Sequence, residues 1–176
     1  MSLTPTDFIP LNISILTVSD TRTEDTDKSG HSLVQALQKD GHVLADKAIV
    51  TDDVYQIRAR ISQWIADSNI QIIIVTGGTG FSHRDITPEA IKPLLDKDIP
   101  GFGELFRHIS LGQIGVSTVQ SRAFAGMANG TFIFALPGST NACKTAWDEM
   151  LHAQLDMRHK PCNFVELLPS VQSRKK

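Results

Sequence analysis

Cysteine is scarce in this sequence, and its scarcity excludes two kinds of stabilisation. The 176 residues include two cysteines, Cys143 and Cys162. There is no CxxC motif and no nearby pair of histidines, so neither a disulfide framework nor a zinc site of standard spacing is expected. We expect a protein of a reducing compartment that uses neither cysteine in catalysis.

A surplus of charge of one sign is also missing. The chain has 17 Lys and Arg against 19 Asp and Glu, which gives a formal charge of −2 and a pI near 6.3. Without a broad basic field, nucleic acid is a poor default partner. Small anions can still bind at local sites.

Long apolar runs are absent as well. No run approaches the ~20 residues that span a bilayer. Residues 1–10 lack the basic and then apolar pattern of a signal peptide. We therefore expect a soluble, cytoplasmic protein with no membrane contact.

The composition is that of an ordinary globular protein, with 41% hydrophobic and 20% charged residues. The length fits one domain over residues 1–176, since domains commonly have ~100–200 residues. Only the ends, about residues 1–7 and 170–176, are expected to be poorly anchored.

Strand-like and helix-like patterns alternate along the chain. The run IQIIIV at residues 70–75 is nearly continuously apolar, as expected for a strand covered on both faces of a parallel sheet. The patterns predict strands at residues 11–19, 43–50, 70–75 and 131–136, and helices at residues 29–40, 53–65, 87–95 and from residues 100 and 139 onwards. This order predicts an α/β domain with a mainly parallel sheet.

Two of the predicted helices carry more detailed signals. In Thr87-Pro88-Glu89, Thr87 fits an N-cap and Pro88 the first helical position. The helix that opens at Pro100 has an apolar stripe that fits either the core or an interface between subunits, formed by Phe102, Leu105, Phe106 and Ile109.

Polar residues follow each of the four predicted strands. They are Ser19-Asp20, Thr51-Asp52-Asp53, the turn Thr76-Gly77-Gly78-Thr79-Gly80 with Asp85 downstream, and Pro137-Gly138-Ser139-Thr140. Because ligands bind beyond the carboxyl ends of the strands in open parallel sheets, we expect these groups to meet in one site.

The glycine-rich turn and the Ser139 segment can both bind anions. Glycines let backbone N–H groups approach a phosphate closely, although the turn matches neither a Walker loop nor GxGxxG. A plain tight turn is the alternative. Ser139 and Thr140 stand where a helix start attracts anions, or where a serine simply caps the helix.

The acids and one arginine near the predicted site also allow two interpretations. Asp52, Asp53 and Asp85 could bind Mg²⁺ together with substrate phosphates. Alternatively, Asp52 or Asp53 caps a helix and Asp85 lies in a solvated loop. Arg122, beside Ser121, suits bidentate phosphate recognition or an ordinary surface position.

Three further features favour a plain structural interpretation. His83 has no nucleophile or metal ligand spaced to it and is expected in solvent. Cys143 is expected to be a small core residue. The acidic run of Glu24, Asp25 and Asp27 is expected to be a solvated loop.

Several motifs together resemble a known family. They are IVTGGTGFSHRDITPEA at residues 74–90, PGFGE at residues 100–104, Ser121-Arg122 and Leu136-Pro137-Gly138. In this order they are similar to the molybdopterin-binding family of molybdenum cofactor biosynthesis, over about residues 10–168. The opening FIPLNISILTVSDTR and the closing KPCNF resemble the B-type branch more closely than the molybdopterin adenylyltransferases.

The resemblance implies a three-layer αβα sandwich that forms trimers or hexamers and binds molybdopterin. In the catalytic branch, Mg-ATP supplies AMP to the pterin, and a molybdenum-insertion protein is a downstream partner. Two family acids correspond to Asp52 and Asp85, as catalytic or Mg²⁺-binding residues. Further pocket residues correspond to Asp20, Gly77, Gly78, Thr79, Gly80, Glu104, Ser121, Gly138 and Ser139.

Two functions stay open from the sequence. The first is a Mg²⁺-dependent molybdopterin adenylyltransferase, which the two retained aspartates favour. The second is a non-catalytic, oligomeric module that binds the pterin or a nucleotide, which the B-type ends favour. A Rossmann-like oxidoreductase is a poor third, because GxGxxG is missing.

Overall fold

A six-stranded sheet forms the centre of the computed structural model, which describes residues 7–173. The strand order is β2-β1-β3-β6-β5-β4. Strands β1, β2, β3 and β6 are parallel, β5 runs antiparallel to β6, and β4 runs antiparallel to β5. The strands are β1 (Asn12–Val18), β2 (Val43–Val50), β3 (Ile72–Thr76), β4 (Lys97–Asp98), β5 (Phe124–Ala128) and β6 (Thr131–Leu136).

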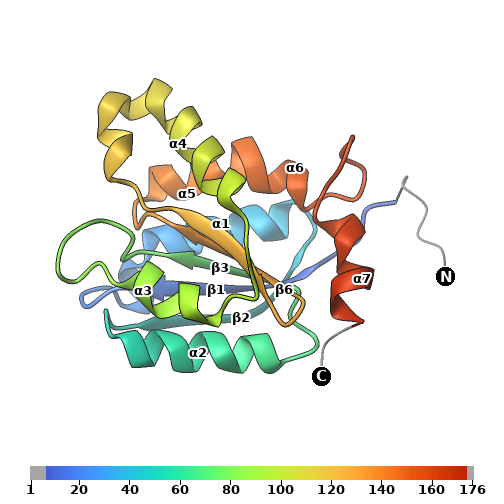
Figure 1. Ribbon diagram of the computed structural model, residues 1–176, viewed down its shortest axis with the longest axis horizontal. Coiled ribbons are helices and arrows are strands. Elements are labelled where there is room, and N and C mark those ends of the chain that lie inside the picture. The colour runs from blue at the N-terminus through green and yellow to red at the C-terminus, as the bar shows by residue number, and fades with distance from the viewer. Residues whose placement is uncertain (1–6, 174–176) are drawn as a thin grey trace.

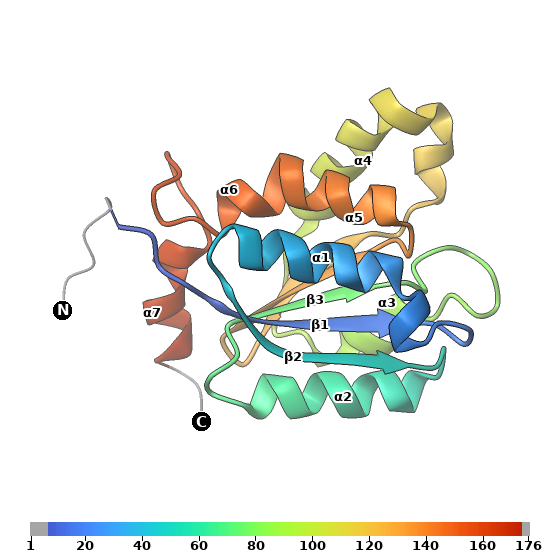
Figure 2. The same ribbon diagram turned by 180° about the vertical axis from the view of Figure 1, so that it is seen from behind.

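Helices cover both faces of the sheet, which confirms the three-layer αβα arrangement (Figures 1 and 2). On one face lie α1 (Lys28–Lys39), α4 (Pro100–Ile114) and a long helix made of α5 (Thr140–Ala146), the π-helical η4 (Trp147–Leu151) and α6 (His152–Gln154). On the other face lie α2 (Val54–Ala66) and α3 (Thr87–Ile91). The remaining short helices are η1 (Glu24–Thr26), η2 (Lys92–Leu94), η3 (Gly115–Gln120), η5 (Val165–Leu167) and α7 (Leu168–Gln172).

The apolar run of β3 shows why the sheet lies between two layers. All five residues of the strand are buried. Ile72 and Ile74 pack towards α1 and α4, whereas Ile73 and Val75 pack towards α2 and α3. Since successive side chains of a strand point to opposite faces, a strand that is apolar at every position needs both faces covered.

The four predicted strands are confirmed, but the sequence patterns missed β4 and β5. Strand β4 has two residues, and β5 has the sequence FAGMA, which is poor in β-branched residues. A hairpin signal was nevertheless present, because Asn129-Gly130 joins β5 to β6 with φ values of 45° and 76°. Asn-Gly is the preferred pair for a tight hairpin turn with two positive φ angles.

Two local predictions are wrong. Thr87 is the first residue of α3 rather than its N-cap, and its hydroxyl donates to the Gly77 carbonyl (2.8 Å). Asp27 is fully buried, where Thr17 and Gly30 donate to its carboxylate and Lys47 lies 3.2 Å away. Hydrogen-bond donors and a cation surround this carboxylate, and they offset the cost of burying its charge, although its neighbours in the sequence are exposed.

The remaining structural predictions have mixed outcomes. Cys143 is buried and His83 is exposed, as expected. On the α4 stripe Phe102 and Phe106 are buried, whereas Leu105 is half exposed. Of the two chain ends, residues 1–6 and 174–176 lie outside the described residues, but residues 170–172 belong to α7 and Val171 packs against the core, so the prediction of a poorly anchored end from residue 170 is wrong there. No helix in the described part of the chain is long and apolar enough to cross a membrane.

Asp53 is expected to stabilise α2 as its N-cap. Its Oδ1 accepts the backbone N–H groups of Tyr55 and Gln56, both at 2.9 Å. Replacing Asp53 by Ala should lower the free energy of unfolding by about 1 kcal/mol, whereas Asn should retain most of it. Urea denaturation measures both effects. Asp25→Ala, which removes an equal charge from an exposed position in η1, serves as the control and should change stability little.

Candidate functional site

The carboxyl ends of the four parallel strands meet at one edge, as the sequence predicted. The strands β1, β2 and β3 point towards this edge, where the β3–α3 loop projects (Figure 2). A cavity of about 380 Å³ lies there. Seven of the residues proposed from the sequence line it: Asp52, Gly77, Gly78, Thr79, Gly80, Asp85 and Gly138.

The glycine turn brings backbone N–H groups to the cavity. Gly77 and Gly78 have φ values of 107° and 65°, which L side chains rarely adopt. A Cβ on Gly77 would lie 2.2 Å from the Val18 carbonyl oxygen, so β1 and the turn are in close contact. Among residues 7–173, the N–H groups of Gly78, Thr79 and Gly138 have no protein acceptor. These donors are therefore available to an anionic ligand.

Asp52 and Asp20 hold the β1 and β2 ends together. The backbone N–H of Asp20 donates to Asp52 Oδ2, and the N–H of Asp52 donates to Asp20 Oδ1, both at 3.0 Å. Desolvation and the nearby Asp20 charge raise the pKa of Asp52. Asp52 Oδ1 accepts no hydrogen bond from the described residues, so it faces the cavity as an available carboxylate oxygen.

Asp85 closes the loop that follows the glycine turn. Its Oδ2 accepts the Ser82 N–H at 2.8 Å, and the Gly80 N–H also lies against the carboxylate. Desolvation raises the pKa of Asp85, but the hydrogen bonds from Ser82 and Gly80 outweigh it, so the net pKa lies below the usual value. Asp85 is therefore charged at neutral pH, and it contributes to the structure of the loop.

Arg122 binds the same loop from outside the cavity. Its Nε donates to the Gly80 carbonyl (2.7 Å), its Nη2 donates to the Asp85 carbonyl (2.6 Å), and its Nη1 pairs with Glu89. The guanidinium also lies over the Phe81 ring. With all three nitrogens engaged, Arg122 orders the glycine loop by contact with its backbone.

Arg84 was missed by sequence reasoning, yet it lines the cavity. Its Nε and Nη2 lie 2.7 and 2.5 Å from Asp20 Oδ2. The hydrogen bond from Arg84 lowers the pKa of Asp20. The available signal was its position beside Asp85 in the loop, but a lone arginine in a polar loop has no spacing that indicates a role.

The other predicted residues lie around two adjacent cavities. Ser139 and Ser121 line a cavity of about 220 Å³ that shares Thr79 and Gly80 with the first one. Ser139 caps α5 through a hydrogen bond from the Ala142 N–H (3.1 Å). Glu104, with Ser121 and Arg122, lines a further cavity of about 730 Å³ beside α4. The three cavities are therefore adjacent: Thr79 and Gly80 line the first two, and Ser121 lines the second and the third.

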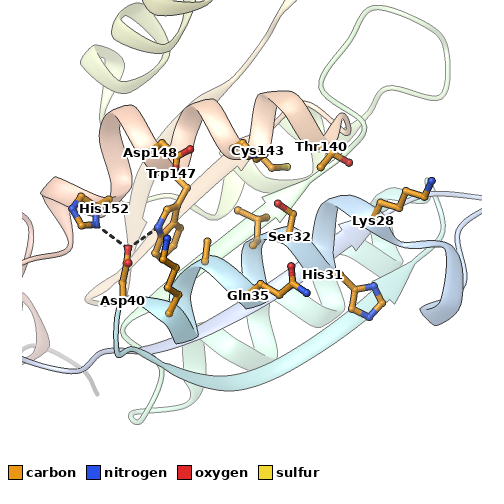
Figure 3. Close-up of a pocket in the computed structure, with 14 residues that line it drawn as sticks. Lys28, His31, Ser32, Gln35, Asp40, Thr140, Cys143, Trp147, Asp148 and His152 are labelled. Atoms are coloured by element: carbon orange, nitrogen blue, oxygen red, sulfur yellow. Dashed lines mark hydrogen bonds and ion pairs between the residues drawn. The ribbon is translucent and has the colours of Figure 1, made fainter.

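A larger cavity lies between α1 and α5, away from these residues (Figure 3). It measures about 790 Å³, and Thr140 lines it, whereas the sequence analysis expected Thr140 at the site beside the glycine turn. Asp40 Oδ2 accepts hydrogen bonds from Trp147 Nε1 and pairs with His152 Nδ1, both at 2.8 Å, so these side chains join the two helices. The free N–H groups and carboxylates of the strand ends make the smaller cavity the better candidate.

The site offers limited protein ligands for a metal. No group of three or more His, Cys, Asp or Glu side chains with metal-binding geometry occurs among the described residues. Asp52 and Asp85 do interact electrostatically, since the Asp85 charge contributes to the raised pKa of Asp52. Mg²⁺ usually binds one or two carboxylates together with substrate phosphates, and this pair fits that pattern.

Comparisons with known proteins agree on one family. The family profile described as "Probable molybdopterin binding domain" matches residues 14–157. Molybdenum cofactor biosynthesis protein B of Escherichia coli strain K12 is 54% identical over 164 residues, covering 93% of this chain and 96% of that protein. The protein of the same name from Staphylococcus epidermidis is 46% identical over 151 residues, and the match covers 83% of this chain and 85% of that protein.

A solved structure is also similar. The tungsten cofactor synthesizing protein MoaB from Pyrococcus furiosus superposes with a TM-score of 0.76 at 34% identity. The match covers 93% of this chain and 98% of that one.

Gly77 should tolerate no side chain. Because its φ is positive and a Cβ would meet the Val18 carbonyl, Gly77→Ala should lower the free energy of unfolding by about 1–3 kcal/mol and distort the turn. Gly101→Ala is the matched control, since a Cβ there meets nothing within 4 Å. Thermal denaturation compares the two variants. Equal stability of both would contradict the close contact of β1 with the turn.

Proposed function

The chain belongs to the molybdopterin-binding family of molybdenum cofactor biosynthesis, and from this we propose that it binds molybdopterin and joins it to AMP from ATP. The observation that carries the proposal is the cavity at the strand ends, where free N–H groups of Gly78, Thr79 and Gly138 lie beside Asp52 and Asp85. Donors for phosphate oxygens and carboxylates for a divalent cation are the groups that phosphoryl transfer needs.

The proposed reaction is a transfer of AMP. A terminal phosphate oxygen of molybdopterin attacks the α-phosphorus of ATP, the bond from this phosphorus to the bridging oxygen breaks, and pyrophosphate leaves. The protein supplies no covalent intermediate. Its contribution is to hold two phosphates in line and to stabilise the charge that develops on them.

Each group of the cavity has a place in this reaction. The backbone N–H groups of the glycine turn bind phosphate oxygens as they stand, because no protein acceptor competes for them. Asp52 and Asp85 would hold Mg²⁺, which neutralises phosphate charge when bound. The raised pKa of Asp52 supports this role, since a carboxylate that is costly to ionise among other acids gains stabilisation from a cation.

The connected cavities support a site for two ligands. The cavity at the strand ends and the one beside Ser139 share Thr79 and Gly80. A pterin and a nucleotide could thus approach the same glycine turn from its two sides. We assign Ser121, Ser139 and Glu104 to this extended site, in agreement with the sequence-based prediction.

One observation favours the alternative of a non-catalytic binding module. The Asp85 carboxylate already accepts N–H groups of its own loop, which reduces its availability to a metal. Incubation of the purified protein with molybdopterin and Mg-ATP distinguishes the two functions. We expect adenylylated molybdopterin, detected by mass spectrometry. If adenylylated product forms no faster than in a sample without protein, while the protein still binds the pterin, the enzymatic function is excluded and the binding module remains.

We also propose a homo-oligomer, a trimer or a hexamer. The segment of α4 and η3 projects from the body of the protein (Figure 1) and exposes apolar side chains, namely Leu111, Ile114, Val116 and Val119. Exposed apolar side chains in one segment favour contact with another chain. Cytoplasmic localisation and a molybdenum-insertion partner stay predictions from the sequence.

The two catalytic aspartates should differ in their effect on stability. Asp52→Asn and Asp85→Asn should each lower turnover by about 10²-fold or more. At neutral pH, however, Asp52→Asn should preserve or raise the melting temperature, because it removes a desolvated charge beside Asp20. Asp85→Asn should lower it, because the hydrogen bonds of the loop stabilise the charged carboxylate.

Thermal melts over a pH series check the sign of each effect. The pKa of Asp85 is lowered in the folded protein, so its stabilisation is present above the unfolded pKa and is lost as the pH falls. The pKa of Asp52 is raised, so its cost exists at higher pH and disappears as the pH falls through the folded pKa. Both variants should therefore approach the wild type in acid. A destabilised Asp52→Asn variant at neutral pH would contradict this account.

A further inference from the structure

Arg84 places a fixed cation at the cavity. Its side chain is half exposed and lines the hollow beside Asp52, Asp85 and the glycine turn. Asp20 holds it through Nε and Nη2, at 2.7 and 2.5 Å. The third nitrogen, Nη1, has no partner among the described residues. The Nη1 amino group is thus free to donate while the guanidinium as a whole is held by Asp20.

The other arginines near the site are placed differently. Arg122 has all three nitrogens engaged with Gly80, Asp85 and Glu89, and it does not line this cavity. Arg22 lines the cavity, but within the described residues its guanidinium makes one hydrogen bond, to the Thr26 carbonyl at 3.3 Å, and has no carboxylate to orient it. Arg84 alone combines a free donor with a charged partner that fixes its direction.

Asp20 explains how Arg84 is oriented. Its Oδ2 accepts from Arg84, while its Oδ1 accepts the Asp52 N–H. The same carboxylate therefore links the arginine to the β2 end, next to the Asp52 side chain. A donor that is ordered before binding loses less entropy when it contacts a ligand.

The charges at the site require such a cation. Asp52 and Asp85 line the cavity proposed to receive phosphates, and Asp20 lies beside Asp52, with which it exchanges two hydrogen bonds. An approaching anion is repelled by carboxylates and attracted by a guanidinium, which matches phosphate geometry well. Backbone N–H groups alone supply only partial charges.

We propose that Arg84 binds a phosphate group of the ligand through its free Nη1, and that Asp20 is the residue that positions Arg84. This proposal deepens the function given above and rests on the same cavity. The phosphate could belong to the pterin or to the nucleotide, which present the same chemical group to the arginine.

Titration calorimetry with ATP, inorganic pyrophosphate and molybdopterin tests the proposal on the full chain. Arg84→Gln should weaken the binding of at least one of these ligands by about 10-fold or more, the usual value of a charge-assisted hydrogen bond. Adenosine, which has no phosphate, should bind Arg84→Gln and wild type alike. Weakening for ATP assigns the phosphate to the nucleotide, and weakening for molybdopterin assigns it to the pterin.

Arg60→Gln is the matched control. Arg60 lies on α2 outside the cavity and also faces a carboxylate, with Nη1 3.7 Å from Asp46. The Arg60→Gln variant loses the same charge as Arg84→Gln and should bind all of these ligands with wild-type affinity. Arg84→Lys should bind with intermediate strength, because it keeps the charge and loses the planar fork. Melting temperatures near the wild-type value are expected for Arg84→Gln, since an ion pair between exposed side chains contributes little to stability.

The role of Asp20 is tested by a double-mutant cycle. Asp20→Asn should weaken phosphate binding less than Arg84→Gln does, and the double variant should bind no more weakly than Arg84→Gln alone. Additive losses would show that Asp20 acts independently of Arg84 and would overturn the positioning role.

Three results would overturn the assignment of Arg84. They are wild-type affinity of Arg84→Gln for every phosphate ligand, a larger loss in Arg22→Gln than in Arg84→Gln, and no binding of any of these ligands by the wild type. The transfer of AMP is judged separately by its product. If the wild type forms no adenylylated pterin but binds phosphates in an Arg84-dependent way, the proposed activity fails and the role of Arg84 stands.

Discussion

The four parallel strands end in register, and every feature of the candidate site depends on this alignment. Thr17 in β1 pairs with Ile49 in β2 and with Thr76 in β3, and Thr76 pairs in turn with Leu136 in β6. Each strand therefore turns into its loop at the same level of the sheet. The alignment brings Asp20 to Asp52 and the glycine turn to Gly138, although these residues are far apart in the sequence. A shift of register between two strands would separate the donors from the carboxylates.

The charges of the site show how a nearly neutral protein can offer a site to anions. The carboxylates of Asp52 and Asp85 line the same cavity, and Arg84 and Arg122 have different contacts near it. Arg122 orders the loop through backbone carbonyls, whereas Arg84 faces the cavity. The opposite pKa directions of Asp52 and Asp85 follow from their surroundings: one is desolvated beside another acid, and the other is compensated by N–H groups. The raised pKa of Asp52 means that the fold, on balance, disfavours the charged form of this carboxylate.

The glycine turn, the acids and the alternation of strands and helices along the chain could be predicted because their signals are local. Short runs of aliphatic and β-branched residues predicted the four parallel strands, a period of 3.6 residues predicted the helices between them, and polar residues after each strand indicated the site. The role of Arg84 could not be predicted, because its partner Asp20 is 64 positions away in the chain. Asp27 was assigned to solvent for a similar reason. Its burial depends on Thr17 and Lys47, which only the packing of α1 against β1 and β2 brings near.

The sequence by itself indicated the candidate residues and predicted that they gather at the carboxyl ends of the strands, because apolar runs and the polar residues and glycines that follow them are signals over a few residues. The tertiary structure decided which of them share a cavity and which charges are paired. It directs the guanidinium of Arg122 to backbone carbonyls and that of Arg84 to the cavity, and it lowers the pKa of Asp85 while raising that of Asp52. These outcomes depend on contacts between segments that are far apart in the sequence. Hydrogen bonds and desolvation at those contacts give residues of the same type different roles.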